Sequence, residues 1–294
     1  MPEPAVGTIY DLGYRNYEGP RLGRAYAVRS LYLESLRSAF GFGRRTSAKV
    51  FPFGLTVLAA FPAIVQVVIG TLSNDVVEVF RAEEYYTYIQ VILALFCAAV
   101  APELVGRDQR HQTLVLYFSR ALTRDDYAIA KFAAMVTVML ALTVGPQAIL
   151  FLGNGLAGND VSGYFREEWD QVVPIVLSGA LVSLLIGSIG IAIAAQTPRR
   201  AFATIGILGP FVILVAVTGI VIESIDIDTS RWAIFLSPFH VMEAATLWLF
   251  DAPPGFDSQI ARADFPGWSY AAVALGVSGA GFVTLLRRYR RMAV

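Results

Sequence analysis

Six stretches of about 20 mostly apolar residues divide this sequence, and no other feature restricts the possible fold as strongly. A helix of this length crosses the hydrocarbon core of a bilayer, which is about 30 Å thick. We therefore expect membrane-spanning helices at residues 50–72, 85–104, 128–152, 172–196, 201–222 and 268–286. Charged residues make up only 16% of the chain, against roughly 25% in soluble domains. The sequence predicts an all-α polytopic membrane protein, with a cytoplasmic arm and helix at 1–49 and a six-span transmembrane domain at 50–294.

Basic residues are divided unevenly between the two sides of the predicted bundle. Of the 23 Lys and Arg residues, 19 fall before the first span, after the last span, or in the loops between spans two and three and spans four and five, and only four fall in the other loops. Cytoplasmic loops are enriched in Lys and Arg, so we expect both termini in the cytoplasm. The first 49 residues contain no early apolar core of the kind found in a cleavable signal peptide. These features predict a multi-pass protein of the bacterial cell (inner) membrane.

One further apolar segment, residues 231–250, is nearly long enough to cross the membrane. Pro238 interrupts its helical pattern, and His240 and Glu243 would be costly in lipid. A crossing here would also place the basic C-terminus outside the cell. Two interpretations remain open: a re-entrant pair of short helices in the outer leaflet before the sixth span, or an amphipathic helix that lies flat on the membrane.

Residues 21–40 are expected to form an amphipathic helix in front of the first span. Apolar side chains recur on one face at helical spacing, and these are Leu22, Tyr26, Leu33, Leu36 and Phe40. Basic amphipathic helices of this kind lie in the membrane interface. The sequence therefore predicts an interfacial helix with membrane lipid as a partner.

The loop between the second and third spans, residues 105–127, is expected to be an ordered element. Residues 108–118 can form a short helix, and the residues that it would expose are Arg110, His111, Leu114 and either Tyr117 or Phe118. Thr123 and Asp126 have the spacing of a capping box, in which each side chain accepts from the backbone of the other at a helix start. A projecting helical hairpin is one interpretation, and an ordered charged loop that only anchors the two spans is the other.

Small residues in the fourth span indicate close helix packing. Gly179, Ser183 and Gly187 follow one another at four-residue spacing, which places them on one face of the helix. Such a face lets another transmembrane helix approach closely. Packing is the expected role of these residues.

Sequence motifs for catalysis or metal binding are missing from the chain. His111 and His240 are expected on opposite sides of the membrane, and the single cysteine, Cys97, can form no internal disulfide. No Gly-Lys pair occurs, so a phosphate-binding loop is excluded. We expect a protein that is not an enzyme, that binds no metal, cofactor or nucleic acid directly, and whose ATP, if it uses any, is bound by another chain.

The topology and one local motif together resemble a known family. The motif is "PELVGRDQRHQTLVLYFSRALTRDDYAIAK", residues 102–131, and the residues that carry it are Asp108, Leu114, Leu116, Ser119, Arg124, Tyr127 and Lys131. The chain resembles the membrane subunit of the type-2 ABC permeases, the exporter group with the type V fold. It departs from the family at Ala121, where proline is common, and at Gln112, where glycine is common.

The resemblance implies that the element between spans two and three is a cytoplasmic coupling helix. In the family this helix docks on a separate ABC ATPase, present in two copies, which binds ATP and Mg, and two permease subunits form the pathway as a homo- or heterodimer. The resemblance assigns apolar anchoring in the ATPase to Leu114, Tyr117 and Phe118. It assigns charge contacts to Arg107, Arg110, Arg120 and Arg124, with His111 exposed beside them.

The mostly apolar spans favour an amphipathic or lipid-like cargo. Two other functions remain open, a secondary transporter and a membrane scaffold or assembly subunit that transports nothing. Titratable groups that could couple transport to an ion gradient are nearly absent from the predicted spans.

Overall fold

The computed structural model describes residues 19, 22–43, 46–73, 79–119, 122–157, 160–224 and 230–292. Most of these residues are helical, and none of them lies in a β-strand. The α-helices are α1 Gly23–Ala39, α2 Ser47–Ser73, α3 Tyr85–Ala101, α4 Arg107–Arg110, α5 Leu114–Phe118, α6 Arg124–Ala157, α7 Val161–Glu167, α8 Val172–Ala194, α9 Arg200–Ser224, α10 Pro238–Leu249, α11 Gln259–Ala263 and α12 Gly267–Arg290. Short 3₁₀ segments are η1 Ala82–Glu84, η3 Trp169–Gln171 and η4 Ser230–Leu236, and η2 Pro102–Gly106 is a π-helix.

Six helical segments are long and apolar enough to cross a membrane, which confirms the predicted number of spans. They cover Ala48–Ser73, Ala82–Arg110, Arg124–Ala157, Trp169–Ala194, Arg200–Ser224 and Gly267–Arg290. Most of them extend beyond the predicted bounds, because their helices continue into polar flanking sequence. The helix is the only spanning structure other than a closed barrel that satisfies every backbone polar group in lipid.

The second span does not end near Pro102, as the sequence suggested. Proline removes one N–H from the helix, and the chain accommodates it with the wider turns of η2 before α4 begins at Arg107. Glu103 in this π-helix pairs with Arg200 at the start of α9, with 2.9 Å between Oε1 and Nη1. Because η1, α3, η2 and α4 follow one another without a break, they form one continuous helical segment, Ala82–Arg110.

Helix α8 lies at the centre of the bundle and contacts α3, α6, α9, α10 and α12. Its backbone approaches two neighbours very closely. A Cβ added to Gly190 would lie 2.0 Å from Sγ of Cys97 in α3, and one added to Gly281 in α12 would lie 2.9 Å from the carbonyl oxygen of Ser188 in α8. Glycine at these positions is what lets the helices pack at this separation.

The small residues singled out in the fourth span all face α6. Ser183 Oγ lies 2.9 Å from Oγ1 of Thr143, and a Cβ on Gly179 would come within 2.5 Å of an α6 side chain. The packing around Gly187 is less tight, because a Cβ there would lie 3.5 Å from its nearest neighbour, Met135. The close contact is thus concentrated at the Gly179 end of this face.

Residues 231–250 form η4 and α10, with the break where the sequence placed it. Ser237 is the N-cap of α10 and Pro238 is its first residue, a position where the missing N–H of proline is harmless. Helix α10 contacts α3, α8, α9 and α12, and most of its side chains are buried. A helix that lies flat on a membrane buries one face only, so this burial favours the re-entrant interpretation.

Helix α1 confirms the predicted helix at 21–40 and packs along α6. Its buried residues, Leu31, Ser35 and Ala39, lie on the side opposite to the predicted apolar face. On the predicted face, Leu22, Tyr26 and Leu33 are exposed, whereas Leu36 and Phe40 pack partly against the core. The protein-facing side was not evident in the sequence, because small and polar residues make up much of it.

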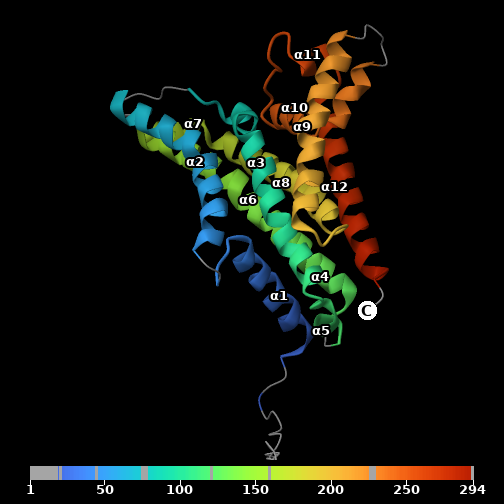
Figure 1. Cartoon of the computed structure of the whole chain (residues 1–294). Coiled ribbons are helices and arrows are strands. Elements are labelled where there is room, and N and C mark those ends of the chain that lie inside the picture. Colours follow the sequence, from blue (N-terminus) through green and yellow to red (C-terminus); the bar gives the residue numbers. More distant parts are fainter. Residues whose placement is uncertain are drawn as a thin grey trace, which may run out of the picture.

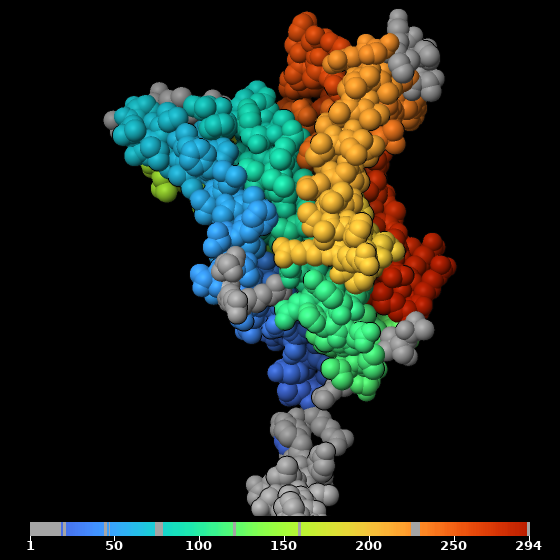
Figure 2. All heavy atoms as spheres, viewed as in Figure 1, coloured from blue at the N-terminus to red at the C-terminus, as the bar shows by residue number. Residues whose placement is uncertain are grey.

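The two ends of the molecule carry different elements (Figure 1). Helices α1, α4 and α5 and the C-terminal end of α12 lie at the lower end, and α11 lies at the upper end. Blue atoms of α1 and green atoms of α4 and α5 form the lowest described part of the surface (Figure 2).

Candidate functional site

The element between the second and third spans consists of two short helices, so the prediction of one helix over 108–118 is wrong. Helix α4 ends at Arg110, and α5 begins at Leu114. Gln112 lies between them with φ of 53°, in the left-handed region. This conformation suits glycine best. We call residues 107–118 the α4–α5 element.

The apolar side chains of α5 point in two directions. Leu114 is 7% exposed and belongs to the core. Tyr117 and Phe118 are half-buried, and their rings lie 5.8 and 5.9 Å from the ring of Tyr127 in α6. The expectation that Leu114 is exposed is therefore wrong, whereas Tyr117 and Phe118 are each partly exposed.

Val115 and Leu116 are the apolar residues of α5 that face outward. They are 53% and 67% exposed, respectively. The apolar run "LVLYF" is too short for its helical spacing to show which side chains pack inward. The inward side is the one that carries Tyr117 and Phe118, which contact the ring of Tyr127 in α6. The outward apolar surface of the α4–α5 element is thus a different one from that predicted.

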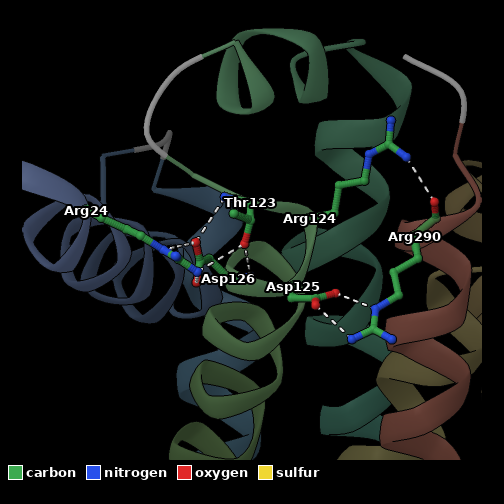
Figure 3. Close-up of polar contacts among 6 residues, drawn as sticks. All are labelled: Arg24, Thr123, Arg124, Asp125, Asp126 and Arg290. Carbon is green, nitrogen blue, oxygen red and sulfur yellow. Dashed lines mark hydrogen bonds and ion pairs between the residues drawn. The ribbon is translucent and has the colours of Figure 1, made fainter.

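The start of α6 has the predicted capping box. The backbone N–H of Thr123 donates to Oδ2 of Asp126 at 3.0 Å, and the backbone N–H of Asp126 donates to Oγ1 of Thr123 at 3.2 Å. Arg24 of α1 donates two hydrogen bonds of 2.8 Å to the same carboxylate (Figure 3). These hydrogen bonds raise the pKa of the Arg24 guanidinium, because they stabilise its charged form. One aspartate therefore caps α6 and holds α1.

The neighbouring aspartate holds the C-terminal end of α12. Arg290 donates to both oxygens of Asp125 at 2.7 Å, and Arg124 Nη1 donates to the carbonyl oxygen of Arg290 at 2.9 Å (Figure 3). The guanidinium of Arg124 also lies 5.9 Å from the ring of Phe118. Arg124, which we expected to contact a partner, is thus engaged within the chain. We call the meeting place of α1, the α4–α5 element, the start of α6 and the end of α12 the junction.

A buried polar cluster fastens α4 to the rest of the junction. Asp108 Oδ2 lies 2.9 Å from Lys131 Nζ and accepts a 2.7 Å hydrogen bond from the Tyr127 hydroxyl. Lys131 is only 5% exposed, and charges this deeply buried are normally paired. The Tyr127 ring lies 4.8 Å from the ring of Tyr289 in α12, whose hydroxyl accepts from Gln109 at 3.2 Å. The pairing of Asp108 with Lys131 could not be predicted from the sequence, since the two residues meet only when α4 folds back on α6.

Two of the predicted charge-contact residues remain available to a partner, and so does the neighbouring His111. Arg107, Arg110 and His111 are exposed around the α4–α5 element. Arg120 lies outside the described residues. No group of three or more His, Cys, Asp or Glu residues that could hold a metal ion occurs in the part of the chain that the structure describes.

Comparison with known families decides the identity of the fold. The model of the ABC-2 family of transporter proteins matches residues 27–294, which include all six spans and most of α1. The chain belongs to the ABC-2 transporter family. Members of this family are membrane permease subunits and are generally not themselves ATPases. No curated protein matches this ABC-2 permease in sequence.

Proposed function

We propose that this permease is the membrane subunit of an exporter, and that the α4–α5 element is its docking site for a separate ABC ATPase. The observation that carries the proposal is a small exposed apolar surface, Val115 and Leu116, on the same short element as the exposed basic side chains of Arg107 and Arg110. An apolar centre with a charged rim is the usual composition of a protein interface. The basic rim suits a partner groove with acidic edges.

The distribution of basic residues supports a cytoplasmic position for the junction. The loops and termini at this end hold 19 of the 23 Lys and Arg residues, and such loops face the cytoplasm in membrane proteins. ATP and Mg are then bound by the partner ATPase on the same side. Both termini share this side, in the multi-pass topology of a bacterial cell membrane protein.

The outer surfaces of α2 and α9 support assembly with a second permease subunit. In the most apolar 18-residue stretch of each span, only 28% of α2 and 22% of α9 is buried in the single chain, compared with 67% for the span that contains α3. Large apolar surfaces face lipid or another subunit. Two permease subunits, identical or homologous, and two ATPase copies form the transporter in this proposal, as in the type V exporters.

The contacts of the junction provide a path for mechanical coupling. Helix α4 continues α3 through η2, so a displacement of the α4–α5 element acts directly on the second span. Asp126 transmits it to α1 through Arg24, and Asp125 transmits it to α12 through Arg290. ATP-driven closure of the two ATPase subunits would therefore move three parts of the bundle together.

Replacement of the outward apolar residues tests the docking site. We expect Val115→Asp with Leu116→Asp to reduce co-purification of the ATPase by about tenfold or more, because carboxylates replace the desolvated centre of the interface. Phe256→Asp is the matched control, since Phe256 is fully exposed near α11, at the other end of the molecule, and its replacement should leave co-purification unchanged.

Retention of the ATPase by the doubly substituted permease would contradict the proposal. Transport that depends on a proton gradient and not on ATP would favour a secondary transporter instead. Loss of a partner complex without any change in transport would favour a scaffold.

A further inference from the structure

A cavity of about 640 Å³ opens at the end of the molecule away from the junction. It lies between the C-terminal end of α10, the chain that follows it, α11 and the first residues of α12. Polar and apolar groups share its walls, and the larger apolar side chains among them are Leu247, Trp248, Pro253, Pro254, Ile260 and Phe265. A volume of this size is typical of small-molecule sites.

The polar groups of this cavity carry negative charge or no charge. Asp251 and Asp264 line it, and no Lys, Arg or His does. Neither carboxylate forms an ion pair within the described residues. Asp251 also follows the C-terminus of the 12-residue helix α10, the end at which the helix dipole is negative. The cavity is therefore electrostatically suited to a cation.

A buried hydroxyl in the same wall has no partner. Tyr270 is 1% exposed, and its hydroxyl makes no hydrogen bond with any described residue. Buried polar groups are nearly always hydrogen-bonded, so this hydroxyl, on a residue of the cavity wall, is a group that a bound molecule could satisfy. A phenol oxygen can accept a hydrogen bond from an ammonium group.

The wall around the hydroxyl is built for close packing. A Cβ on Gly267 would lie 2.5 Å from Cβ of Trp248 and 2.6 Å from its ring, so glycine is required for the indole to sit against the start of α12. The indole lines the cavity beside Asp251. Trp is the aromatic side chain with the strongest attraction for cations.

We propose that this cavity binds an organic cation, an ammonium group attached to an apolar or aromatic body. The apolar body would fill the space between Trp248 and the proline-containing wall, and the ammonium would lie near Asp251, Asp264 and the Tyr270 hydroxyl. A free cation fits better than the zwitterionic headgroup of a phospholipid, because no basic side chain lines the cavity to receive a phosphate. This site is independent of the junction and of the ATPase.

Equilibrium binding of radiolabelled phenethylammonium, a primary ammonium with three N–H donors, to the full-length protein in dodecyl maltoside tests the proposal. We expect saturable binding that benzenesulfonate, an anion of similar size, does not displace. Asp251→Asn with Asp264→Asn should weaken binding by about tenfold or more, and added salt should weaken binding to the native protein more than binding to this variant. Tyr270→Phe should weaken it by a smaller factor, about threefold.

Asp257→Asn is the matched control. Asp257 lies in the same loop and also has a left-handed backbone, but it pairs with Arg262 at 2.9 Å and does not line the cavity. Its replacement should change the affinity by less than about twofold.

Three results would overturn the proposal. They are the absence of saturable binding up to about 10 mM probe, an equal loss of affinity in Asp257→Asn, and stronger displacement of the probe by dihexanoylphosphatidylcholine than by unlabelled phenethylammonium. The last result would assign the cavity to a lipid headgroup. Because the assay contains no ATPase, its outcome is separate from that of the docking experiment.

Discussion

At the scale of single residues, Gln112 determines the shape of the α4–α5 element. A left-handed backbone costs a residue with a Cβ about 1–2 kcal/mol, and glycine avoids most of this cost. We expect Gln112→Gly to stabilise the protein by about 1 kcal/mol or less, because glycine also gains entropy in the unfolded chain. The measurement is the melting temperature of the purified protein in detergent. Gln112→Ala is the control, and an equal increase in both variants would contradict this explanation.

At the scale of helix packing, replacement of two glycines by alanine is expected to change the stability of the protein in opposite directions. Gly281→Ala should destabilise the protein by about 1–3 kcal/mol, because its methyl group would lie 2.9 Å from a backbone oxygen of α8 that cannot move aside. Gly187→Ala should be neutral or stabilising by up to about 1 kcal/mol, since it has room for a methyl group and alanine favours helix. Thermal unfolding in detergent measures both, and an unchanged melting temperature in Gly281→Ala would contradict the packing described here.

The sequence predicted the elements more accurately than the contacts between them. The spans follow from apolar length, and the capping box of Thr123 and Asp126 follows from local spacing, so both were predictable. The contacts of Asp108 with Lys131 and of Tyr117 with Tyr127 depend on how α4 and α5 fold back on α6. No periodicity encodes that arrangement, which is why Leu114 was expected at the outer surface and Leu116 was not.

At the scale of the whole molecule, the ion pair between Asp125 and Arg290 should separate docking from coupling. We expect Arg290→Glu to leave the ATPase bound, because the outward surface of α5 is unchanged, but to reduce ATP-driven transport through repulsion from Asp125. The exchanged pair, Asp125→Arg with Arg290→Glu, should restore much of the transport. Parallel assays of co-purification and transport in vesicles distinguish the two steps. Full transport by Arg290→Glu alone would show that α12 is not part of the coupling path.

The central claim is that the α4–α5 element is the contact site of a separate ATPase, and photo-crosslinking from position 116 tests it most directly. Leu116 is 67% exposed and lies at the centre of the proposed docking surface, so p-benzoylphenylalanine can replace it without disturbing the core. Irradiation of intact cells followed by mass spectrometry identifies the partner. The account predicts a covalent adduct with a protein that contains an ATP-binding cassette. Adducts with lipid alone, or with a protein on the outer side of the membrane, would contradict it.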